Sequence, residues 1–108
     1  MYDPSYLTVL TTVPDKSTSR AIIDQLLQQH VAASVQVLGP VESHYWWKGK
    51  IERAEEWLCV IKTTKARYAI VETIIIEHHP YDIPEIIALP IVAGKDAYLT
   101  WISRYASA

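Results

Sequence analysis

The chain has few glycines and one cysteine, and both shortages narrow the range of functions. With only 3 glycines in 108 residues it lacks a glycine-rich loop to cradle a phosphate, and it has no HExxH, P-loop or nucleophile-elbow motif. We therefore expect that the protein is not an enzyme. Cys59, the single cysteine, excludes an intrachain disulfide, which suits a reducing compartment. Its apolar neighbours indicate an inert core residue.

Clusters of positive charge and long apolar runs are absent as well. The net charge is −2, and the densest basic pair, Lys48 and Lys50, flanks a turn, which argues against a nucleic-acid partner. No stretch is long and apolar enough to span a membrane, and residues 1–5 contain an acid and a proline where a leader would carry basic residues. We expect a cytoplasmic protein with no membrane partner.

Hydrophobic side chains, by contrast, are abundant. They make up 50% of the chain and include 4 tryptophans and 7 tyrosines. A length of 108 residues allows one domain, residues 1–108, with one core. Because so small a core cannot bury that many large side chains, the surplus predicts self-association, which converts exposed apolar surface into interface.

The first half of the chain shows strand and helix signals in turn. Residues 6–13 are β-branched and short, and they predict a strand. Asp15 is expected to cap a helix that runs to about residue 30. Residues 31–47 form a long extended segment, which Gly39-Pro40 is expected to interrupt with a bulge or bend.

The second half continues the alternation. A turn at Lys48-Gly49 leads into a second long strand, residues 50–63, then a helix over residues 65–78 and a strand over residues 85–91. Asp96 is expected to cap a terminal helix. The side chains expected on one face of that helix are Ala97, Tyr98, Trp101, Ile102 and Tyr105.

The order βαββαβ plus a helix is the ferredoxin-like arrangement. It is an α+β fold with one antiparallel sheet and helices on one face of that sheet. The two long strands, residues 31–47 and 50–63, carry apolar side chains on both faces. A sheet that is apolar on both sides needs a partner on both sides, so we expect the hairpins of several copies to meet.

The most informative segment is His78-His79-Pro80-Tyr81-Asp82-Ile83-Pro84-Glu85-Ile86. The prolines push His79 and Ile83 into extended conformations, so the helix must stop here and a stiff loop must follow. His78, His79, Asp82 and Glu85 around that loop are suited to bind a cation or a polar ligand. Simpler roles are open for each: the histidines can satisfy the last helix carbonyls, Asp82 can form a turn, and Glu85 can protect a sheet edge.

A second block, Tyr45-Trp46-Trp47-Lys48-Gly49-Lys50-Ile51-Glu52, is typical of a tryptophan-rich hairpin tip. The acids that follow the tip, Glu52, Glu55 and Glu56, are expected to form a solvated rim. Together the two blocks resemble the divalent-cation tolerance family known as CutA. The similarity continues through Thr11-Thr12-Val13-Pro14-Asp15, Ala32-Ala33-Ser34-Val35-Gln36, Ile61-Lys62-Thr63 and Tyr98-Leu99-Thr100-Trp101-Ile102.

The resemblance implies a ferredoxin-like fold, a tight homotrimer similar to PII signalling proteins, and a role in the response to divalent metal ions such as copper. In some members copper binding involves the histidine that matches His78, the glutamate that matches Glu85, and a cysteine near the end of the first strand. Here Thr11 or a neighbour takes the cysteine position, which argues against a soft copper(I) site. Two further departures are Ser34 and Gln36, where the family often has Cys and Asn.

We therefore expect weak binding of Cu or another divalent metal ion through His78 and Glu85, with Asp82 as a further ligand. In a trimer, the loop of one subunit is expected to meet the hairpin tip of another and form a ligand cleft. Its residues are Trp47, Lys50, Glu52, Lys62, Tyr81 and Asp82. The alternative function is a PII-like sensor or signalling scaffold that binds a small molecule in this cleft and acts on a protein partner. A third class, a hydrolytic enzyme that uses His78 or His79 with Asp82 or Glu85, has little support because the chain has no catalytic motif.

Overall fold

The computed structural model describes residues 5–108 as a four-stranded antiparallel sheet with three α-helices. The elements are, in order, β1 (Tyr6–Val13), α1 (Lys16–Gln28), β2 (Ser34–Trp47), β3 (Lys50–Thr64), the short 3-10 helix η1 (Lys65–Arg67), α2 (Tyr68–His78), β4 (Ile87–Pro90) and α3 (Asp96–Tyr105). The strand order across the sheet is β2-β3-β1-β4. The predicted ferredoxin-like α+β fold is confirmed.

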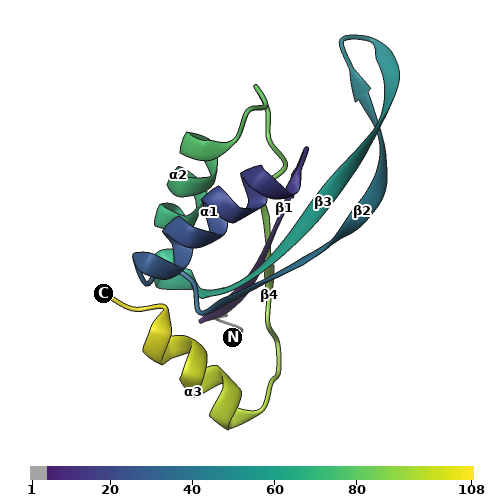
Figure 1. Cartoon of the computed structure of the whole chain (residues 1–108). Coiled ribbons are helices and arrows are strands. Elements are labelled where there is room, and N and C mark those ends of the chain that lie inside the picture. The colour runs from purple at the N-terminus through teal and green to yellow at the C-terminus, as the bar shows by residue number, and fades with distance from the viewer. Residues whose placement is uncertain (1–4) are drawn as a thin grey trace.

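Helices α1 and α2 lie side by side over one face of the sheet, whereas α3 lies apart from them at the end where the chain begins (Figure 1). The core sits between this helix pair and the sheet. Residues alternate along β1, so that Leu7, Val9, Thr11 and Val13 are buried under the helices while the residues between them face the other side. The opposite face of the sheet carries neither α1 nor α2, as Figure 1 shows, and the α3 segment reaches it at Tyr6 and Thr64.

Both long helices begin and end for identifiable reasons. The Asp15 carboxylate accepts a hydrogen bond of 2.7 Å from the Thr18 amide, which is the predicted N-cap of α1. α2 forms although its isoleucines favour strands, because Val71, Ile74 and Ile75 bury one side of it against the core. It stops at His78, and His79 is extended as its neighbour Pro80 requires.

Strands β2 and β3 form a long hairpin that projects beyond the rest of the body (Figure 1). Its tip is the predicted turn, with Lys48 and Gly49 both at positive φ. The predicted bend is also present, because the register of the pair shifts between Leu38 and Val41 around Gly39-Pro40. No helix among residues 5–108 is long and apolar enough to cross a membrane.

Several details differ from the sequence expectations. β2 begins at Ser34 rather than at residue 31, and the helix expected over residues 65–78 is split into η1 and α2. β4 spans Ile87–Pro90 rather than residues 85–91, because its pairing with β1 begins at Ile87 opposite Leu10, while Ile86 packs against the core. Lys95, not Asp96, is the N-cap of α3, and Asp96 is the first helical residue. On α3 Ile102 is buried, whereas Tyr98, Trp101 and Tyr105 are exposed. The Tyr98 and Trp101 rings stack, and the Trp101 and Tyr105 rings meet at a tilt of 56°.

Candidate functional site

The loop between α2 and β4 is fixed by the side chain of His79. Its Nε2 lies 2.7 Å from the carbonyl oxygen of Thr12. Thr12 is near the end of β1, past the residues of β1 that pair with β4. Its Nδ1 accepts a hydrogen bond of 3.2 Å from the Tyr81 amide. Because Nδ1 accepts, Nε2 must carry the proton and donate to Thr12, so both ring nitrogens serve the loop. His79 is therefore a structural residue here.

A second anchor joins the same loop to β3. The Tyr81 hydroxyl donates a hydrogen bond of 2.8 Å to Glu56, whose side chain is only 4% exposed. The expectation of a solvated rim is thus wrong for Glu56, although Glu52 and Glu55 are exposed. Burial of Tyr81, together with its hydrogen bond to Glu56, raises the pKa of the phenol.

Glu56 was missed because nothing in its own neighbourhood marks it. It stands in a run of acids, and a run of that kind normally faces water. Only the folding back of the loop places Tyr81 over it, at a separation of 25 residues. The available signal was indirect: Tyr81 is an amphipathic side chain between two prolines, and a buried tyrosine hydroxyl needs a partner.

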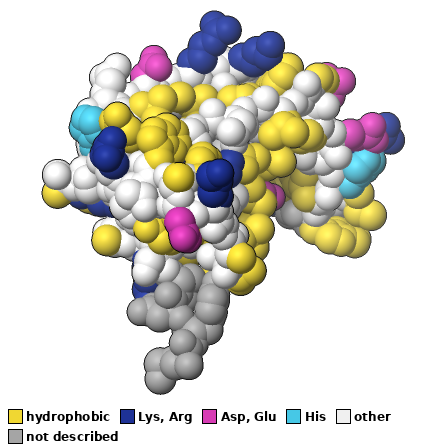
Figure 2. Space-filling model, turned by 90° about the horizontal axis from the view of Figure 1, so that it is seen from below, with side chains coloured by type: hydrophobic (Ala, Val, Ile, Leu, Met, Phe, Trp, Pro, Cys, Tyr) yellow, Lys and Arg dark blue, Asp and Glu magenta, His cyan; other side chains and the backbone are white. Residues whose placement is uncertain are grey.

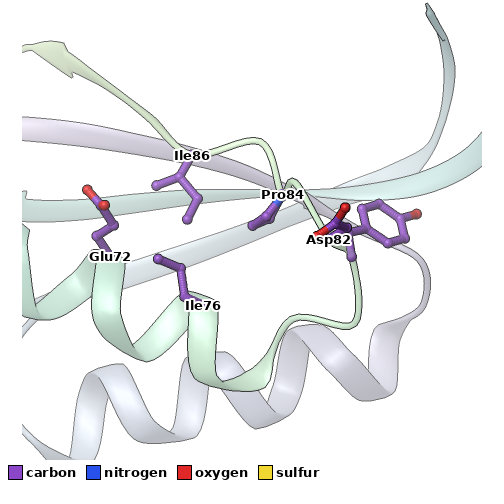
Figure 3. A pocket seen from close by; sticks show the side chains of 6 residues that line it. Glu72, Ile76, Asp82, Pro84 and Ile86 are labelled. Carbon is purple, nitrogen blue, oxygen red and sulfur yellow. The ribbon is translucent and has the colours of Figure 1, made fainter. Parts of the chain in front are cut away.

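Next to these anchors is a hollow between α2 and the loop, of about 300 Å³. Figure 3 shows Glu72 and Ile76 rising from α2 toward Pro84 and Ile86, with Asp82 at one end. The lining combines carboxylates with apolar side chains: Glu72, Ile76, Tyr81, Asp82, Pro84 and Ile86. Glu72 also accepts a hydrogen bond from Tyr68, which, after burial, is the second cause of the raised pKa of that phenol.

The three expected metal ligands lie on one short segment but do not form a complete site within one chain. His78, Asp82 and Glu85 are all exposed. Among residues 5–108, no three histidine, cysteine or acidic side chains are close enough together to hold a metal ion. The Nδ1 of His78 lies 2.9 Å from the Ile74 carbonyl, so it donates there, and in the neutral tautomer Nε2 is the free acceptor. The histidine therefore satisfies a helix carbonyl and keeps one nitrogen available for a metal.

The expected cleft residues lie in three separate regions of the single chain. Tyr81 and Asp82 lie beside the hollow, whereas Trp47, Lys50 and Glu52 lie at the hairpin tip, where the Lys48 ammonium is 5.8 Å from the Trp47 ring centre. Lys62 is near the far end of β3, about 40 Å along the strand from Lys50. One chain alone does not bring these groups together.

Residues 7–105 match the family model described as CutA1 divalent ion tolerance protein. The chain belongs to the CutA1 family. The resemblance seen in the hairpin and loop motifs is thereby confirmed. The family description speaks of tolerance to divalent ions and names no chemical reaction.

Individual relatives agree with this assignment. The chain is 35% identical over 98 residues to "Protein CutA, chloroplastic" of Arabidopsis thaliana, a match that covers 91% of this chain and 54% of the relative. It is 35% identical over 95 residues to "Divalent-cation tolerance protein CutA" of Pectobacterium atrosepticum, covering 88% and 86%. The chain thus spans about half the length of the plant relative and most of the bacterial one.

Solved structures support the fold in the same way. The crystal structure of CutA1 from the psychrotrophic bacterium Shewanella sp. SIB1 superposes with a TM-score of 0.94. The sequence identity is 36%, and the match covers 99% of this chain and 100% of that one. The arrangement of the strands, hairpin and helices described above is therefore the CutA1 fold.

Proposed function

We propose that this CutA1 chain works as a homotrimeric, divalent-metal-responsive binding protein of the cytoplasm rather than as an enzyme. The metal is copper or another divalent ion, held weakly by His78 and Glu85 with Asp82 as a further ligand. The remaining coordination positions are filled by water or by a neighbouring subunit. The observation that carries this proposal is the orientation of His78.

The bond from His78 Nδ1 to the Ile74 carbonyl is the kind of outer contact that metal-binding histidines use. It fixes the ring and its tautomer and presents Nε2 as the ligand atom. An imidazole with carboxylates is a borderline donor set that suits Cu(II), Zn or Ni. Cys59 does not add a soft ligand, because it is fully buried and its burial raises the pKa of the thiol to about 11. That protected thiol also suits the cytoplasm, whereas the name of the Arabidopsis relative places that protein in the chloroplast.

Self-association is supported by the projecting hairpin. Its paired residues Trp46 and Ile51 are 72% and 67% exposed, and no other part of the described chain covers them. A two-stranded ribbon with large apolar side chains is stable in water only when it packs against another body. A neighbouring copy supplies that body. It also brings Trp47, Lys50 and Glu52 to the Tyr81 and Asp82 loop of the next subunit, which forms the intersubunit cleft.

A second candidate function is a PII-like small-molecule sensor or signalling scaffold with a protein partner. The hollow beside Asp82 favours it, since a concave site with a few polar groups and apolar walls is typical of small-ligand binding. On this alternative the metal is secondary. The cleft ligand shifts the state of the loop, and the trimer presents that state to the partner.

Isothermal titration with Cu(II) and Zn(II) tests the first proposal, beside native mass spectrometry for the number of chains and bound ions. We expect a trimer that binds metal weakly. The double substitution His78→Ala with Glu85→Ala is expected to remove most of that binding while the trimer persists. His44→Ala is the matched control, because His44 is also exposed and also lies beside an acid, Glu42, at 2.7 Å.

The two functions separate clearly in this experiment. If the double variant binds metal as the parent does, the proposed ligands are wrong. If the parent binds no metal but retains a nucleotide or another small molecule added in the same titration, the sensor function replaces the metal-responsive one. A monomer in the mass spectrum at micromolar concentration would contradict the assembly in both.

A further inference from the structure

Lys62 lies on the face of the sheet opposite α1 and α2, one row from the pair Tyr6 and Thr64, which α3 and the residue after it contact. Strand pairing arranges the side chains of this face in rows across the strands. In the strand order β2-β3-β1-β4, the first row contains Ser34, Lys62, Thr8 and Leu89. The second row contains Gln36, Val60, Leu10 and Ile87. The third row, which β4 does not reach, contains Leu38, Leu58 and Thr12. The face is thus mainly apolar with a few neutral polar groups, and Lys62 is the charged residue of these rows. We define these three rows as the open face.

The three rows of the open face contain hydroxyl and amide groups but no carboxylate. The Lys62 ammonium donates to the side-chain carbonyl of Gln36, its one partner among residues 5–108. The Ser34 hydroxyl in the same row is buried and has no hydrogen-bond partner within the described chain. The nearest acid on the same side of β3 is Glu56, about 20 Å along the strand and already bound to Tyr81.

If neighbouring copies cover the open face, burial of the Lys62 ammonium costs free energy. Leu38, Ile87 and Leu89 are about half exposed. Hydrophobic side chains also form patches on the side of the molecule that Figure 2 shows from below. The proposed self-association gives these side chains a partner, and the inference that follows rests on that proposal. When neighbouring copies cover the open face, the Lys62 ammonium loses water and keeps only a neutral amide as partner. Burial of an unpaired charge is strongly unfavourable, so such a group needs a counterion.

We infer that assembly through the open face creates an anion site at Lys62, which takes a small oxyanion of the phosphate type. In a closed symmetric ring, equivalent lysines lie at equal distances from the axis, and their charges add toward it. Each copy contributes the Lys62 ammonium and two neutral donors. The Thr8 hydroxyl lies in the row of Lys62, and the Gln36 amide lies in the next row. The anion balances the ammonium groups and thereby stabilises the assembly. This site is distinct from the metal ligands at His78, Asp82 and Glu85.

Thermal unfolding of the whole chain tests the site, with inorganic phosphate compared with sodium chloride at matched ionic strength. Sedimentation velocity is run on the same samples. We expect phosphate to raise the melting temperature of the parent assembly by a few degrees in a saturable way, because a ligand of the folded state stabilises it. A parallel titration with adenosine monophosphate distinguishes a site for free phosphate from a site for an organic phosphate. A site for free phosphate excludes adenosine monophosphate, which then leaves the melting temperature unchanged. A site for an organic phosphate accepts it, and the melting temperature rises.

The variant Lys62→Met removes the charge and keeps much of the length. We expect it to assemble, to melt higher than the parent in chloride, and to show no response to phosphate. Lys95→Met, at an exposed position just before α3, is the matched control and should respond as the parent does. If Lys62→Met does not fold, Lys62→Arg keeps the charge and is expected to keep the response.

An assembled parent whose melting temperature is the same in phosphate and chloride overturns the anion site and leaves the proposed function intact. The same holds if Lys62→Met responds to phosphate as strongly as the parent. A parent that sediments as a monomer overturns the proposed assembly and this site with it. The sedimentation result therefore distinguishes the two failures.

Discussion

Tyr81 and Glu56 are joined by a hydrogen bond of 2.8 Å between a loop phenol and a buried strand carboxylate. Of the acids in the described chain, Glu56 is the buried one, and its partner comes from the segment that carries Asp82 and Glu85. The bond holds this segment against β3, while His79 holds it against β1. Asp82 and Glu85 therefore stand on a loop whose position is set by Tyr81 and His79, two side chains that are not metal ligands, whereas His78 is the last residue of α2.

Replacement of Tyr81 by Phe should destabilise the fold by about 1–3 kcal/mol, because it leaves the Glu56 carboxylate buried without its donor. Urea denaturation measures the change in unfolding free energy. Tyr45→Phe is the control, because Tyr45 is exposed on the hairpin. Equal stability of the two variants would show that the Tyr81 bond contributes nothing.

Stability should fall at alkaline pH, and Cys59 should account for part of the fall. Burial raises the pKa of its thiol to about 11, whereas an unfolded chain has a cysteine pKa of about 8.5. Between these values the unfolded state has lost the proton that the folded state keeps, so stability is fully present below about pH 8.5 and declines toward pH 11.

Melting temperatures measured from pH 8 to pH 11 test this for the parent and for Cys59→Ala. At pH 8 the melting temperature of the variant is expected to be lower than that of the parent, because the side-chain packing of Cys59 is lost. Between pH 8 and pH 11 its melting temperature is expected to decline less steeply. The melting temperature of the variant should still decline somewhat, because the raised pKa values of Tyr68 and Tyr81 also reduce stability at alkaline pH. Parallel curves for parent and variant would contradict the role of the thiol.

Tight packing at Gly39 gives a further prediction. A Cβ atom at this position would lie 2.5 Å from Cε3 of Trp57, so Gly39→Ala must displace the indole ring and should cost about 1–3 kcal/mol. The cost should shrink in a Trp57→Leu background. Gly49→Ala is the control: its Cβ meets no atom within 4 Å, and its cost comes from the positive φ of 78° alone.

A double-mutant cycle from urea denaturation therefore separates the two glycines. The cost of Gly39→Ala should depend on whether residue 57 is Trp or Leu, whereas the cost of Gly49→Ala should not. Independence of Gly39→Ala from residue 57 would mean that the ring moves away without strain.

The fold could be predicted from the sequence because its signals are local. Asp15 before α1, Gly39-Pro40 in β2 and Lys48-Gly49 at the hairpin tip each determine one feature through their own backbone preferences. Details that depend on distant contacts were not predictable. The start of β4 is set by its register with β1, and Glu56 is bonded by a residue 25 positions away.

The candidate site was predictable as a set of residue types but not as an arrangement. His78, Asp82 and Glu85 are adjacent in sequence, and the structure keeps them on one exposed segment. The hairpin-tip residues and Lys62 were grouped with them through an expected trimer. Whether they meet depends on contacts between chains, which no pattern within a chain determines.

The exposed pair Trp46 and Ile51 gives the last prediction. Both side chains are largely in water in the single chain, at 72% and 67% exposure, so replacing both by serine should cost the fold of one chain little. In the proposed trimer they become interface, and their loss should shift the sedimentation coefficient toward the monomer while the circular dichroism spectrum keeps its helix and strand signals. The matched control is the double change His44→Ser with Arg53→Ser, the neighbouring cross-strand pair of polar residues in the same hairpin. If the Trp46 and Ile51 variant sediments like the parent, the hairpin tip is not an interface, and the cleft that depends on it must be abandoned.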